Sequence, residues 1–108
     1  WYSIGNMLSS QLTVEQLTSA VAGFTIRKDE SGKVAVDTIT IDPTFMSYSW
    51  PAAAKTAENL AARTNLKLQP LKDANSDIQT MFGSNRSASE RLAFLRQTVG
   101  TSVPVNYR

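Results

Sequence analysis

The most constraining feature of the sequence is a change of hydrophobic period inside the stretch AENLAARTNLKL. Leu60 and Thr64 lie one helical turn apart, whereas Leu66 and Leu68 alternate as they would in a strand. Asn65 separates the two patterns, and asparagine is the usual substitute for glycine where the backbone enters the left-handed conformation. We therefore predict a helix, a one-residue corner and a strand, which places the chain among α+β folds.

A second passage of the same kind occupies SASERLAFLRQTVGTSVPV. Ser87 and Glu90 form a capping box that starts a helix, and Gly100 is placed to end it. The apolar stripe of this helix is Ala88, Leu92, Leu95 and Val99. A last strand is predicted after Gly100, with Val103, Val105 and Tyr107 on one face.

The front of the chain predicts helical segments. Residues 1–12 are predicted to form a short amphipathic helix or arm, because Trp1, Ile4, Leu8 and Leu12 recur at near-helical spacing. The pattern fits one helix continuous with the next segment as well as two separate helices. Thr13 and Gln16 then form another capping box. The helix that they start is expected to end at Gly23 and to bury Val14, Leu17 and Val21.

From Phe24 the period becomes two. Phe24 and Ile26 are predicted to face Val34 and Val36 in a hairpin whose turn is KDESGK. The apolar positions are even-numbered up to Val36, but Ile39 and Ile41 are odd-numbered. A strand cannot keep one face buried through such a change, so a bulge or bend is expected near Asp37.

The remaining segments alternate between strand and helix. Pro43 limits ladder pairing, and Met46, Tyr48 and Trp50 then alternate along a half-buried strand. Pro51 starts an alanine-rich helix that runs to Thr64. A strand is predicted for DIQTMF, with Ile78 and Phe82 directed inward. Residues 44–108 thus form a split β-α-β-β-α-β domain, preceded by residues 1–43 as a helical arm and β-hairpin extension.

The composition of the 108 residues argues against several functions. There is no cysteine and no histidine, which removes the usual zinc ligands, cysteine nucleophiles and histidine-based triads, and no cofactor is expected. The net charge is +2 and the basic residues are dispersed, so nucleic-acid binding is not favoured. Asp73 and Asp77, or Glu58 beside Lys55, show no convergence of the kind that acid–base catalysis needs. We predict that the chain is not an enzyme.

The two helix-to-strand passages resemble the short N-terminal domain of secretins and TonB-dependent signalling receptors. The first signature is Leu60-Ala61-Ala62-Arg63-Thr64-Asn65-Leu66-Lys67-Leu68, where Asn65 replaces the glycine of the family. The second places Leu92, Leu95 and Gly100 in matching positions, with Val99 inserted between Thr98 and Gly100. With its hairpin extension, the chain is most similar to the DotD/TraH lipoproteins of type IVB secretion and conjugation systems.

This resemblance implies a structural subunit of a bacterial secretion or conjugation complex, in the periplasm and associated with the outer membrane. Its partners would be other core-complex proteins, with a homo-oligomeric ring as one arrangement. Membrane contact would come only through a lipid anchor on a cysteine ahead of Trp1, outside this chain. Two alternatives stay open: the N-terminal domain of a TonB-dependent receptor or secretin, and a small nucleic-acid-binding domain.

Partner contacts are predicted at the apolar positions of the front stripe and at the last strand. They are Trp1, Ile4, Leu8, Leu12 and Val105. The front stripe could dock in a groove of a neighbouring subunit or pack on its own domain. Val105 lies on a strand whose edge could accept another strand, although Pro104 reduces that capacity. Trp50 is interpreted as a core aromatic rather than a partner anchor.

Overall fold

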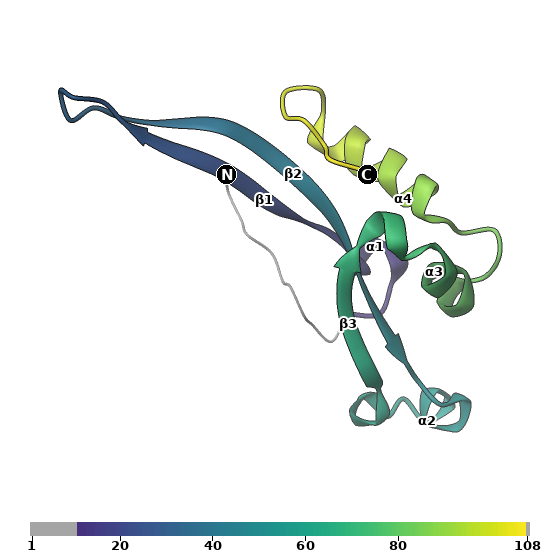
Figure 1. Cartoon of the computed structure of the whole chain (residues 1–108). Coiled ribbons are helices and arrows are strands. Elements are labelled where there is room, and N and C mark those ends of the chain that lie inside the picture. The colour runs from purple at the N-terminus through teal and green to yellow at the C-terminus, as the bar shows by residue number, and fades with distance from the viewer. Residues whose placement is uncertain (1–10, 108) are drawn as a thin grey trace.

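The computed structural model describes residues 11–107, which form a mixed α/β chain with one three-stranded antiparallel sheet (Figure 1). The predicted α+β class is confirmed. In chain order the elements are α1 (Val14–Leu17), β1 (Thr18–Lys28), β2 (Val34–Ser49), α2 (Ala52–Thr56), the 3-10 turn η1 (Leu60–Ala62), β3 (Thr64–Pro70), the 3-10 turn η2 (Leu71–Asp73), α3 (Asn75–Phe82) and α4 (Ala88–Val99).

The strand β2 is central in the sheet, between β1 and β3. It pairs with β1 from Val34 to Phe45, whereas β3 pairs only with its C-terminal part, from Thr44 to Ser49. The predicted hairpin is confirmed, because Ile26 lies opposite Val36 and Lys28 lies opposite Val34. The predicted boundary between residues 43 and 44 falls inside β2.

The bulge predicted near Asp37 is present in β2. Thr38 and Ile39 together face the single residue Phe24, and the pairing is regular again on both sides. Thr38 has a φ of 49°, in the left-handed region. The extra residue returns the odd-numbered and even-numbered apolar positions of β2 to the same face of the ribbon.

Asn65 has the predicted left-handed conformation, with a φ of 54°. Its position differs from the prediction, because Asn65 lies inside β3 rather than at a corner between a helix and a strand. Asn65 and Leu66 together face Tyr48, so Asn65 is the first residue of a second bulge. The helical spacing before it belongs to the short turn η1.

The helix α2 is shorter than predicted, because a Schellman motif ends it. Asn59 N–H donates to the carbonyl of Ala54 at 2.9 Å, and Glu58 N–H donates to the carbonyl of Lys55 at 3.0 Å. Glu58 takes the left-handed position of the motif, with a φ of 55°. The alanine-rich run therefore stops at Thr56 instead of Thr64.

The predicted helix from Thr13 to Gly23 is also wrong beyond its first turn. Thr13 does cap α1, since its hydroxyl accepts a hydrogen bond from Gln16 N–H at 3.3 Å. The chain leaves the helix after Leu17 because the residues from Thr18 onward pair with β2. Tertiary pairing overrides the local helical pattern.

The DIQTMF segment forms the helix α3, so the strand predicted there is wrong. Ile78 is fully buried and Phe82 packs against the core, so both are directed inward as predicted. Among the described residues after α4, only Val105 pairs with the sheet, through one parallel bridge to Ile41. The split β-α-β-β-α-β order is therefore not confirmed over residues 44–107.

The core lies where α1, α3 and α4 pack against the part of the sheet around Phe45 and Met46. Phe45, Leu17, Leu71 and Ile78 are its largest fully buried side chains. The cluster also contains Val14, Met46, Ala74, Ala88 and Leu92. The core thus combines residues from both sides of the predicted domain boundary.

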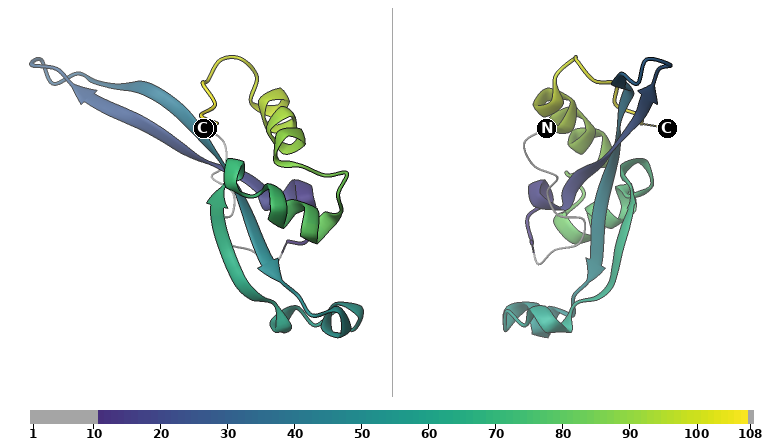
Figure 2. Two further views of the ribbon diagram at one scale, coloured as in Figure 1. Left: turned by 45° about the vertical axis from the view of Figure 1, so that its right-hand side comes forward. Right: turned by 90° about the vertical axis from the view of Figure 1, so that its left-hand side faces the viewer.

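The described part of the chain is elongated. It measures 62 × 27 × 21 Å and its radius of gyration is 17.0 Å, against about 13 Å for a compact chain of this length. Figure 1 and the left view of Figure 2 show the β1–β2 hairpin extending beyond the helices. The end of this hairpin is the part of the sheet with the least cover.

Candidate protein–protein interface

The candidate site is one face of the projecting β1–β2 hairpin. Residues opposite each other in an antiparallel ladder share a face, and so do residues two apart on one strand. The pairs Ile26–Val36 and Lys28–Val34 therefore lie on the same face as Phe24. The bulge adds Ile39, and the five apolar side chains on this surface, here named the apolar ribbon face, are Phe24, Ile26, Val34, Val36 and Ile39.

All five side chains of the apolar ribbon face are well exposed. Their exposed fractions are 58% for Phe24, 62% for Ile26, 60% for Val34, 57% for Val36 and 42% for Ile39. Single exposed apolar residues are common on protein surfaces, but a contiguous group of large ones marks an interaction site. The group here is contiguous because the ladder places its members side by side.

The opposite face of the same ribbon is polar. It carries Thr25, Arg27, Ala35 and Asp37. Arg27 donates a hydrogen bond to Asp37 at 2.7 Å, in an ion pair that is exposed to solvent. Such exposed pairs add little stability, but they show that this face is suited to water, in contrast to the apolar ribbon face.

The apolar ribbon face continues the buried surface of the sheet. Ala22 is opposite Ile41, and both share the face of Phe24 because β1 contains no bulge. Ile41 is only 3% exposed, whereas Ile39, the next apolar residue of β2 on this face, is 42% exposed. The C-terminal segment pairs with the backbone of Ile41 through bonds of 3.0 and 2.8 Å, so it lies beside β2 in the plane of the sheet. Burial of this face therefore ends between Ile41 and Ile39, and the same apolar stripe continues exposed to solvent.

The turn at the tip of the ribbon is well ordered by Asp29. The carboxylate of Asp29 accepts hydrogen bonds from the hydroxyl of Ser31 at 2.6 Å and from Lys33 N–H at 2.9 Å. These bonds, that of Ser31 first, lower the pKa of Asp29. Gly32 supplies the left-handed residue that the turn needs, with a φ of 85°. The ribbon is thus held in shape by its own turn.

The partner contacts predicted from the sequence lie elsewhere. Trp1, Ile4 and Leu8 lie outside the described residues. Leu12 is 38% exposed, and Val105 is partly buried against the core beside Ile41. The structure does not bring Leu12 or Val105 into the apolar ribbon face.

Trp50 fixes the α2 end of the molecule to the sheet. Its indole N–H donates to the carbonyl of Asn59 at 2.9 Å. Its ring packs edge-to-face on Tyr48, with the centroids 6.2 Å apart. The guanidinium of Arg63 lies over the Tyr48 ring, 4.9 Å from its centroid. Trp50 is only partly exposed, in keeping with a structural role.

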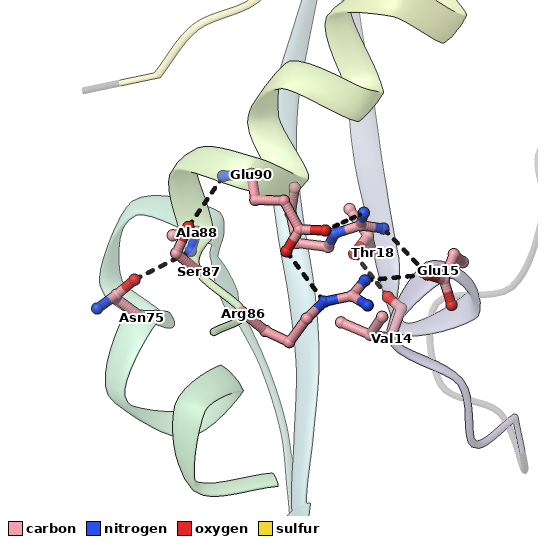
Figure 3. Close-up of polar contacts among 9 residues, drawn as sticks. Val14, Glu15, Thr18, Asn75, Arg86, Ser87, Ala88 and Glu90 are labelled. Atoms are coloured by element: carbon pink, nitrogen blue, oxygen red, sulfur yellow. Dashed lines mark hydrogen bonds and ion pairs between the residues drawn. The ribbon is translucent and has the colours of Figure 1, made fainter. Parts of the chain in front are cut away.

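A cluster of four charged side chains joins α1 to the start of α4 (Figure 3). Arg86 donates to Glu15 and to Glu90, each at 3.0 Å. Arg91 donates to Glu90 at 2.9 Å and lies 3.8 Å from Glu15. Since Glu15 and Arg86 are 71 residues apart, the cluster fixes α1 against the helical part of the chain.

The carboxylates of this cluster are suited to ion pairing. The pKa of Glu15 is lowered first by a hydrogen bond with the backbone of Glu15 itself and then by the side-chain hydrogen bond from Arg86. Burial opposes ionisation of Glu90, but the hydrogen bond and charge of Arg91, together with the charge of Arg86, lower the pKa of Glu90. Lowered values favour the ionised form at neutral pH, so neither group is prepared to donate a proton.

Arg91 is the most buried member of the cluster, with a side chain only 5% exposed. Its Nε and Nη1 atoms have no hydrogen-bond partner, and its guanidinium stacks over Phe94 at 4.9 Å. The cluster as a whole holds α1 against the start of α4 and has a structural role.

The carboxylates considered for catalysis do not form an acid–base pair. Asp77 accepts a hydrogen bond from Gln69 at 2.6 Å and lies 3.3 Å from Lys67. The bond from Gln69, followed by that from Lys67, lowers the pKa of Asp77. Asp73 is exposed to solvent. These contacts connect β3 to α3 and are structural.

Comparison of the chain with protein-family models, curated proteins and solved structures finds no match. Within residues 11–107, no helix has the length and apolar content needed to cross a membrane.

Sequence reasoning predicted the strands of the ribbon but missed its role as a candidate interface. The alternation of Phe24, Ile26, Val34 and Val36 indicates one apolar face. The missing information is which surface covers that face. One signal was available, because a run of strand pattern from Val34 to Ser49 is longer than the usual strand, and a chain of this size has few elements to cover it.

Proposed function

We propose that this chain is a non-enzymatic structural subunit that assembles through protein–protein contacts, with the apolar ribbon face as a main contact surface. The observation that carries this proposal is the continuation of the core stripe past Ile41 onto five exposed apolar side chains. Burial of such side chains is the dominant favourable term in protein association. A ribbon with one apolar and one polar face is suited to contact on one side only.

We also propose that the assembly is a bacterial secretion or conjugation complex at the outer membrane and periplasm. This part rests on the resemblance to the DotD/TraH lipoproteins and the secretin N-terminal domain. The left-handed Asn65, with a φ of 54°, and Gly100, with a φ of 80° after α4, are compatible with the glycine positions of that motif. The split β-α-β-β-α-β topology belongs to this proposal.

The contact surface can be tested in the native cell with the complete gene. A photo-cross-linking amino acid replaces Ile26 on the apolar face in one strain, and Arg27 on the polar face in a matched strain. We expect cross-linked adducts of the Ile26 variant that are absent from the Arg27 variant. Adducts of equal yield at both positions, or none at residue 26, would contradict the assembly proposal.

The location can be tested separately by fractionating the same cells. We expect the protein in the outer-membrane fraction and its release by detergent. Recovery in the cytosol would reject the envelope assignment and would leave the cross-linking result to decide whether the chain assembles.

A further inference from the structure

We propose that the apolar ribbon face binds the same face of a second copy of this chain. This inference rests on the proposed function, because it names the partner of the surface described above. In the arrangement, two ribbons pack face to face across a two-fold axis, so that Phe24, Ile26, Val34, Val36 and Ile39 of each copy are buried against the other.

The exposed area is sufficient for such a contact. With roughly 100 Å² for each half-exposed large apolar side chain, the five residues offer about 500 Å² per copy. Two copies would bury about 1,000 Å² in total, which reaches the minimum for a biological interface and belongs to weak, reversible association. The residues at the border of the face would add to this area.

The charges near the face favour a copy of itself over a strongly charged partner. Residues 24–39 carry as many basic as acidic side chains: Arg27, Lys28 and Lys33 against Asp29, Glu30 and Asp37. Two neutral ribbons do not repel each other, whereas a strongly acidic or basic partner would find no complementary field here. An isologous contact requires a surface that is complementary to itself, and an apolar face meets that requirement.

The shape of the molecule gives the second copy access. The ribbon projects away from the helices in Figure 1, so a second ribbon can approach to about 10 Å, the usual distance between packed sheets. Lys28 shares the apolar face beside the turn. Its aliphatic stem can cover apolar surface while its ammonium group stays in solvent at the rim.

Packing would also stabilise the projecting end of the ribbon. An isolated two-stranded hairpin is marginally stable in water. The ribbon is paired in the single chain because β1 and β2 continue into the core, and a second apolar face would add to the stability of its projecting end.

The test uses the purified 108-residue chain in sedimentation-velocity runs over a range of concentrations. Val36→Glu places a charge in the centre of the face, and Ala35→Glu places the same charge on the opposite face of the same strand. We expect Val36→Glu to weaken self-association at least about tenfold, and Ala35→Glu to change it less than about threefold. Circular dichroism verifies that both variants keep the fold.

A thiol cross-linking experiment provides a second measurement. The chain contains no cysteine, so Val36→Cys and Ala35→Cys each carry a single thiol. A bismaleimide that spans about 10 Å, the distance between packed sheets, should join the Val36→Cys protein into a dimer in much higher yield than the Ala35→Cys protein. Equal yields, or a wild-type chain that stays monomeric up to about 1 mM, would overturn the inference.

The two proposals can fail separately. A monomeric chain whose Ile26 photo-cross-links in cells to a protein of a different mass would reject self-packing and retain the assembly role. A chain that neither self-associates nor cross-links at Ile26 would reject both. An adduct of twice the mass of the chain supports both.

Discussion

The two bulges of the sheet contain different residues at equivalent positions, and their exchange should change stability in opposite directions. Thr38 and Asn65 are each the first of two residues that face one residue on the neighbouring strand. Their φ angles are 49° and 54°. A left-handed conformation costs an ordinary residue roughly 1–2 kcal/mol, and a β-branched residue is the least suited to it, whereas asparagine tolerates it.

The magnitudes follow from the local contacts. Asn65→Thr should lower the free energy of unfolding by about 1 kcal/mol. The hydrogen bond from the Asn65 side chain to Ser49, at 3.4 Å, is long and adds little. Thr38→Asn should stabilise the ribbon by about 0.5–1 kcal/mol, because the hydrogen bond from Thr38 N–H to Asp37 at 2.9 Å comes from the backbone and is retained.

The two variants need different assays. Asn65 lies in the three-stranded part of the sheet, so urea unfolding reports its effect. The ribbon can open without unfolding of the core, so the effect of Thr38→Asn is read from amide hydrogen exchange of residues 24–28 and 34–37. Thr25→Asn makes the same chemical change at a regular strand position, where we expect a loss of a few tenths of a kcal/mol. The reasoning is refuted if Thr38→Asn speeds exchange as Thr25→Asn does, or if Asn65→Thr leaves stability unchanged.

Three further variants test other parts of the structure. Glu58→Gly should raise the free energy of unfolding by up to about 1 kcal/mol in urea titrations, because Glu58 holds the left-handed position of the α2 Schellman motif. Ile78→Ala should cost about 2–5 kcal/mol in the same assay, whereas Phe94→Ala, at a half-exposed site, should cost less than about 1 kcal/mol; similar losses would contradict the described core. The folded pKa of Glu15 lies below its usual 4.5, so its contribution is present above that value and is lost as the pH falls through the folded pKa. Thermal unfolding of Glu15→Gln should therefore show lower stability than wild type at neutral pH and a smaller loss below about pH 4.5, and parallel pH curves would count against this ion pair.

Local signals in the sequence predicted the parts of the fold that local chemistry decides. The Asp29–Gly32 turn, the bulge beside Asp37 and the cap of α4 at Ser87 all depend on neighbours within a few residues, and all are present. The left-handed conformation of Asn65 belongs to the same group. Each follows from side-chain chemistry or from the parity of apolar positions along one strand.

The errors occurred where one spacing fits two structures. Ile78 and Phe82 are four residues apart, which places them on one side of a helix and also on one side of a strand. Tertiary contacts decide between the two, and here the segment packs as a helix against the core. Val21 likewise fits the helical spacing of Val14 and Leu17, but it pairs with Asp42 in the sheet. The uncovered state of the ribbon face is likewise a tertiary property, which alternation alone does not reveal.

The order of the ribbon in the single chain bears on how it can bind. Its turn is held by the bonds of Asp29, its register is fixed by a bulge at Thr38, and its strands are already paired. Association of such a preformed surface does not have to order a flexible segment, so more of the energy of apolar burial is available for binding. A contact of about 1,000 Å² can then be specific despite its modest size. The stabilising variant Thr38→Asn should therefore leave the affinity of self-association unchanged or raise it. If the ribbon had to unfold before it could bind, the same variant would lower that affinity.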